Sequence, residues 1–161
     1  MTNYPSSDAR IWIYLSHRPL DEEEVRHISQ ELQTFCRSWT AHGQLVRAGA
    51  MVLHHQMVLL FADESQTPVS GCSVDASVRF LRQLGERLNI DFFNRRLIAT
   101  LQNDKLVVLP WEELRRQLVA GELSPDVNVV PTWLTEWKAF RSQYFIPLNQ
   151  TPLYRQLLPA E

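Results

Sequence analysis

The sequence predicts an α+β fold, a ferredoxin-like β-α-β-β-α-β sandwich with an extra strand and C-terminal helices. Two nearly continuous apolar runs, 10–16 and 56–62, predict strands that are buried on both faces. An amphipathic stretch with apolar residues at helical spacing follows each run. The first and third strands are central in a ferredoxin-like sheet, and the two runs are these strands. We therefore expect them to be neighbours near the centre of one sheet.

The first helix has a well-defined predicted start. Asp21 is a good N-cap, and Glu24, three residues later, completes a capping box. Acidic residues at 22–24 also suit the positive end of the helix dipole. Apolar side chains then recur at helical spacing from Val25 to Trp39, and Gly43 is the expected stop.

The middle of the chain predicts a hairpin, a helix and a second hairpin. Segments 45–54 and 56–62 are joined by a short link, which favours an antiparallel pair. The second helix is expected over 74–88, with Ser73 as its cap. Segments 97–102 and 105–109 flank Asn103-Asp104, which is typical of a tight turn.

The C-terminal part predicts two more helices. Pro110 suits the first turn of one, which Gly121 would end. Thr132 is the expected cap of the other, which carries Trp133 and Trp137. Its aromatic residues either close the core or form an exposed patch for a partner. Residues 1–9 and 148–161 are expected to be irregular tails of a single domain over 1–161.

Composition narrows the classes of protein to which the chain can belong. Its 161 residues are 45% hydrophobic and 21% charged, with a formal net charge of -2, as in ordinary globular domains. No basic stripe argues for nucleic acid or an anionic membrane as partner. No apolar run approaches the roughly 20 residues of a membrane helix, and no signal peptide is recognised. We expect a cytoplasmic protein with Cys36 and Cys72 as free thiols.

Motifs for common cofactors are absent from the sequence. It has no Walker A loop, no glycine-rich dinucleotide fingerprint and no HExxH pair, so no cofactor is expected. The only clustered histidines, His54 and His55, would point to opposite faces of a strand and could not easily share one ion. No metal site is therefore expected.

One loop is the candidate binding site. It comprises Ser70, Gly71, Cys72, Ser73 and Asp75 and leads into the second predicted helix. Free backbone N–H groups and the positive dipole end at a helix start favour a bound anion or a thiolate. Ordinary helix capping explains the same residues, and a cysteine commonly acts as a small apolar side chain.

A thiol nucleophile would need a base. The candidate bases are His42, His54 and His55, which lie near predicted strand ends. The sequence does not show whether any of them reaches the thiol, so no catalytic residue is assigned and the sequence leaves open whether the chain is an enzyme.

Four segments resemble a family of short bacterial proteins without an assigned activity. They are RPLDEEE (18–24), FCRSWTAHG (35–43), DES (63–65) and SGCSVDASVRFL (70–81), and SGCSVDASV is the most distinctive. Some members of that family are labelled as ABC transporter ATPases. The missing Walker A loop argues against that label for this chain.

Two functional hypotheses follow from the sequence. The first is a non-catalytic cytoplasmic domain that binds a partner protein or a small ligand. The alternative is an enzyme or an anion-binding protein that uses the loop around Cys72.

Overall fold

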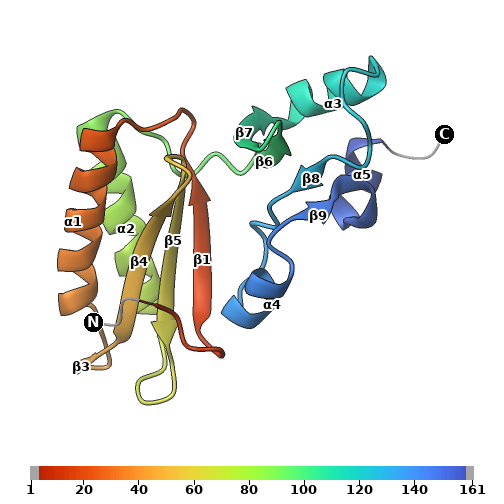
Figure 1. Ribbon diagram of the computed structural model, residues 1–161. Helices are drawn as coiled ribbons and strands as arrows, with labels where there is room; N and C mark the ends of the chain where they lie inside the picture. The colour runs from red at the N-terminus through yellow and green to blue at the C-terminus, as the bar shows by residue number, and fades with distance from the viewer. Residues whose placement is uncertain (1–3, 159–161) are drawn as a thin grey trace.

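The computed structural model describes residues 4–158, which form two larger sheets, a two-stranded one and their covering helices (Figure 1). In chain order the elements are β1 (Arg10–Leu15), α1 (Glu22–Ser38), β2 (Thr40–Ala41), β3 (Gln44–Leu45), β4 (Arg47–Leu53), β5 (Met57–Asp63), α2 (Gly71–Leu88), β6 (Leu97–Gln102), β7 (Lys105–Pro110), α3 (Trp111–Val119), β8 (Asn128–Val129), α4 (Trp137–Ser142), β9 (Ile146–Pro147), the 3-10 turn η1 (Leu148–Gln150) and α5 (Pro152–Leu157). The α+β class predicted from the sequence is confirmed.

The first sheet has the strand order β1-β5-β4. Both outer strands run antiparallel to β5, so β1 and β4 are parallel to each other with β5 between them. With α1 connecting β1 to β4, this is the split β-α-β arrangement. Figure 1 shows α1 and α2 side by side on one face of this sheet, as expected from the sequence.

The central strand β5 is apolar throughout because both of its faces are covered. Successive side chains of a strand point to opposite faces. Met57, Leu59 and Phe61 pack toward the C-terminal part of the chain. Val58, Leu60 and Ala62 pack toward the helices. All six are at most 1% exposed.

The four-stranded ferredoxin-like sheet is not confirmed, because its fourth strand belongs elsewhere. The segment expected there is β6, which pairs with β7 on one edge and with β8 on the other. Both edges of β6 are therefore occupied, and it cannot also pair with β1. As a result β1 lies at an edge of its sheet, and the prediction that it would be interior is wrong. Its predicted pairing with β5 is confirmed.

The second sheet, with the order β7-β6-β8-β9, forms the C-terminal part together with α3, α4 and α5. The predicted hairpin around Asn103-Asp104 is confirmed, and both turn residues have positive φ. The prediction of an irregular tail after 148 is wrong for 148–158. Leu148 and Leu157 are both fully buried, and they anchor η1 and α5 in the core around α3. The expected tail residues 1–3 and 159–161 lie outside the described residues.

The start of α1 is as predicted, but its end is not. The Asp21 carboxylate accepts a hydrogen bond from the Glu24 N–H at 2.8 Å, and the Glu24 carboxylate accepts one from the Asp21 N–H at 3.0 Å. The helix ends at Ser38, before the expected stop. Gly43, with φ of 75°, lies instead in the turn of the small β2–β3 hairpin.

The helix expected to start at Thr132 begins five residues after that cap. It is the short α4, which starts at Trp137 after Glu136. Trp137 and Phe140 are 7% and 0% exposed and pack against the β1–β5 face, whereas Trp133 lies in the preceding turn and is 45% exposed. Trp137 and Phe140 therefore close the core, as one of the two readings expected, and Trp133 is exposed. Within 4–158, no helix has the length and apolarity needed to cross a membrane.

Candidate functional site

The loop around Cys72 is the start of α2. The helix is capped by Ser70 rather than by the expected Ser73, because Ser73 occupies the third helical position of a capping box. The Ser73 N–H donates to the Ser70 hydroxyl at 3.2 Å, and the Ser70 N–H donates to the Ser73 hydroxyl at 2.8 Å. The backbone carbonyl of Ser73 accepts a bond from the Trp39 indole at 2.8 Å. Both hydroxyls therefore serve the helix start.

Gly71, Cys72 and Asp75 are exposed in the first turns of α2. No hydrogen bond among the described residues joins Cys72 to a histidine. His54 instead contacts the Tyr144 hydroxyl, with Nε2 and oxygen 2.6 Å apart. These residues therefore show helix capping, and the structure adds no base or ligand group to them.

The three histidines considered as bases all lie in turns. His42 is in the β2–β3 turn, and His54 and His55 form the β4–β5 turn, each with positive φ. His55 Nδ1 lies 3.2 Å from the backbone carbonyl of Leu20. In the part of the chain that the structure describes, no three His, Cys, Asp or Glu side chains gather as a metal-binding group.

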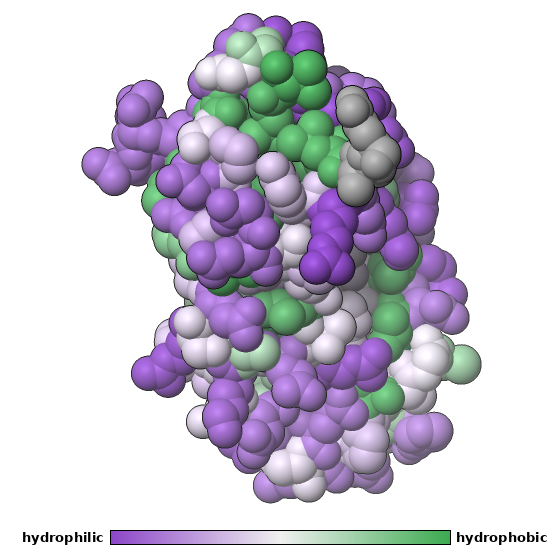
Figure 2. Space-filling view, turned by 90° about the vertical axis from the view of Figure 1, so that its right-hand side faces the viewer, coloured by the Kyte–Doolittle hydropathy of each residue, from purple (hydrophilic) through white to green (hydrophobic). Residues whose placement is uncertain are grey.

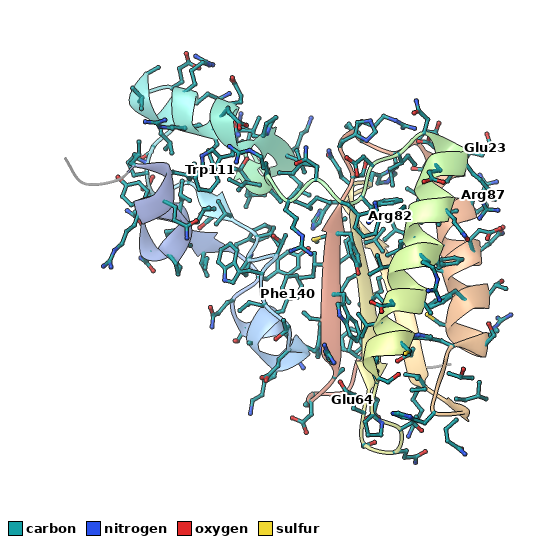
Figure 3. The ribbon with its side chains drawn as sticks, turned by 180° about the vertical axis from the view of Figure 1, so that it is seen from behind. Glu23, Glu64, Arg82, Arg87, Trp111 and Phe140 are labelled. Atoms are coloured by element: carbon teal, nitrogen blue, oxygen red, sulfur yellow. The ribbon has the colours of Figure 1, made fainter. Side chains whose placement is uncertain are left out.

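A cavity lies elsewhere, in a groove of about 840 Å³ beside β1. All five residues from Ile11 to Leu15 line it. One wall comes from α2 and from the 92–95 segment, and the other from 132–135, Trp111 and the start of α5. Figure 3 shows Arg82 on the α2 side and Trp111 on the α3 side. Its volume falls within the range of about 300–1,000 Å³ typical of binding pockets.

Apolar side chains that remain partly exposed form most of the groove. Trp12, Ile13 and Tyr14 of β1 are only half-buried, although they belong to the most apolar run of the sequence. Val78 of α2 and the exposed Trp133 face the same space. A concave apolar surface of this kind is typical of a binding site.

Two arginines supply the positive charge of the groove. Arg82 and Arg95 both line it and are exposed, and the Arg82 guanidinium lies 4.6 Å from the centre of the Phe93 ring. Burial raises the pKa of Tyr14, while the positive charge of Arg95 acts in the opposite direction. Neither arginine is within ion-pair distance of a carboxylate among residues 4–158.

The face turned to the viewer in Figure 2 is largely hydrophilic, with hydrophobic residues gathered toward its upper end. Val119, at the end of α3, is the most exposed large apolar side chain of the described residues, at 71%. It does not line the groove, so it is a suitable control position for the groove residues.

Comparison with known proteins provides no homologous site. No family model matches the chain, and neither a curated protein nor a solved structure has significant similarity to it. The groove was not predicted from the sequence. The available signal was the apolar run IWIYL, which indicates a covered strand whether the cover is protein core or a groove wall.

Proposed function

We propose that this chain is a non-catalytic cytoplasmic binding domain that holds a segment of a partner protein in the groove beside β1. The groove is the observation that supports this function most directly. It combines half-buried aromatic and branched apolar side chains with two arginines that have no acidic partner among residues 4–158. Interfaces are enriched in Tyr, Trp and Arg, and all three line this groove.

A binding role fits the groove better than a catalytic one. Its lining contains no histidine, cysteine or carboxylate, so it lacks the usual general bases and nucleophiles. Thiol chemistry at Cys72 has less support, since neither a base nor the groove reaches that side chain.

The test is selection of linear peptides from a random library displayed on phage, with the full chain as target. Library members of about ten residues cover the normal range of strand lengths. We expect to select peptides that bind the native protein. Trp133→Ala should lower their affinity about tenfold, since aromatic side chains that become buried in an interface commonly contribute more than 1 kcal/mol of binding free energy.

Val119→Ala is the matched control, because it also removes an exposed apolar side chain but lies outside the groove. Equal losses of peptide affinity in the two variants would show that the peptide binds outside the groove. Failure to select any peptide that competes at the groove would contradict the proposed function.

A further inference from the structure

Backbone groups of β1 line the groove along its outer edge; Ile13 is half-buried there, whereas Ile11 and Leu15 are 1% and 6% exposed. In the β1–β5 ladder, Arg10 is opposite Ala62 and Leu15 is opposite Met57, and the Ser16 N–H extends the same register by donating to the Gln56 carbonyl at 2.9 Å. Residues alternate along an antiparallel strand between bonding inward and bonding outward. Even-numbered residues of β1 therefore bond to β5, and the backbone groups of 11, 13 and 15 point to the other side.

Both ends of this outer edge are already paired within the chain. The Ile11 N–H donates to the Thr135 carbonyl and the Trp137 N–H donates to the Ala9 carbonyl, each at 2.9 Å. At the other end the His17 N–H donates to the Asp91 carbonyl at 3.1 Å. The chain thus adds one antiparallel bridge at the start of β1, between Arg10 and Glu136, and one bond after the strand.

Between these ends the edge is open. The Ile11 carbonyl and the N–H and carbonyl of both Ile13 and Leu15 have no hydrogen-bond partner among residues 4–158. An unpaired strand edge is a template for a further strand. Since β6 is held in the second sheet, no strand described here occupies this position.

The groove also indicates what a strand here would carry. Within the described residues Arg82 and Arg95 line it without a carboxylate partner, while the nearby Arg87 and Arg96 are paired with Glu31 and Glu112. An acidic side chain on the added strand would complement the two unpaired guanidinium groups.

We propose, building on the proposed function above, that an extended segment of a partner protein adds to β1 as a strand and presents a carboxylate to Arg82 and Arg95. Main-chain bonds to Ile13 and Leu15 hold the segment, and alternate apolar side chains pack on the groove walls. An extended segment suits this edge better than a second folded copy of the chain, because the edge lies in a groove between two walls.

The first measurement is backbone amide exchange in the full chain, with and without a saturating peptide selected from the phage library. We expect the amide of the half-buried Ile13 to exchange rapidly alone and at least about tenfold more slowly with peptide, whereas the buried Leu15 starts from slower exchange and should gain further protection. The Trp12 and Tyr14 amides, which bond to β5, are internal controls that should be slow in both states.

The second measurement is N-methylation of the peptide, one backbone position at a time. Strand addition predicts affinity losses of roughly tenfold at alternate positions and little change between them, because only alternate N–H groups face β1. A peptide that binds without protecting Ile13 and Leu15, or that tolerates every methyl group, overturns strand addition and leaves the proposed binding function intact.

The third measurement is charge reversal. Arg82→Glu should weaken an acidic peptide by roughly fivefold, the size of a solvent-exposed ion pair, and a lysine in place of the peptide's acidic residue should restore binding. Arg79→Glu, on the same helix but outside the groove, is the matched control and should have no effect. Equal effects of the two variants overturn the assignment of a carboxylate. Without peptide, the Ile13 amide should exchange at the same rate at every protein concentration. Slower exchange at higher concentration overturns the proposal in favour of self-association.

Discussion

The side chain of Phe140 tests whether the C-terminal part shares a core with the β1-β5-β4 sheet. Phe140 is fully buried on α4 and packs in one cluster with Phe61 and Trp137 (Figure 3). Replacing a buried phenylalanine with alanine costs about 3–5 kcal/mol, from lost burial and from the cavity that remains. For a chain of this length, each kcal/mol lowers the melting temperature by about 2–4 °C. We therefore expect Phe140→Ala to lower it by roughly 6–20 °C.

The assays are thermal melting, which gives the melting temperature, and urea denaturation, which gives the free energy of unfolding, each followed by tryptophan fluorescence and by far-ultraviolet circular dichroism. Because the shared cluster joins the two sheets, both signals should report one transition for a single domain. Lys138→Ala, at an exposed position on the same helix, should change the free energy of unfolding by no more than about 0.5 kcal/mol. A loss below about 1 kcal/mol for Phe140→Ala, or two separate transitions in the wild type, would refute the shared core.

Four further outcomes are expected. In the native protein a thiol reagent should label Cys72 rapidly and leave Cys36 unreacted, since burial raises the pKa of Cys36 to about 12; complete labelling of both before unfolding would contradict this. The ion pair with Arg18 lowers the pKa of Glu24 to about 2 from its ordinary value of 4.5, so its stabilisation should be fully present above pH 4.5 and lost as pH falls toward 2. Glu24→Gln should accordingly reduce the difference between the urea midpoints at pH 6 and pH 3, and an unchanged difference would show that other groups govern the acid dependence. Asp21→Ala should cost about 1 kcal/mol through the lost helix cap, and an unchanged urea midpoint would count against it. Calorimetry with Mg-ATP should show no saturable heat, because the chain has no Walker A loop, whereas micromolar binding would restore the transporter label.

The sequence alone determined the features that depend on near neighbours in the chain. The capping box of Asp21 and Glu24 joins residues three apart, and the turn at Asn103-Asp104 joins adjacent strands. Such contacts close short loops, so residue type and spacing are enough to predict them. The alternating and continuous apolar runs also gave the strands and the pairing of β1 with β5.

The sequence pattern predicted the wrong one of two serines as the N-cap of α2. Both Ser70 and Ser73 suit an N-cap, and each hydroxyl does bond at this helix start. Only the backbone conformation showed that the helix begins at Gly71, with Ser70 as its cap. The sequence also did not distinguish Trp133, which is exposed, from Trp137, which is buried.

Only the tertiary structure decided which sheet β6 joins, and with it the candidate site. The apolar pattern of a strand indicates that its two faces are buried. It does not indicate the neighbouring strands, because the backbone groups at a strand edge can form hydrogen bonds with any other strand. Because β6 pairs with β7 and β8, the outer edge of β1 is left open between its two paired ends. Residues as distant in sequence as Ile13, Arg82 and Trp133 then line one groove, which no local pattern specifies because its walls come from separate parts of the fold.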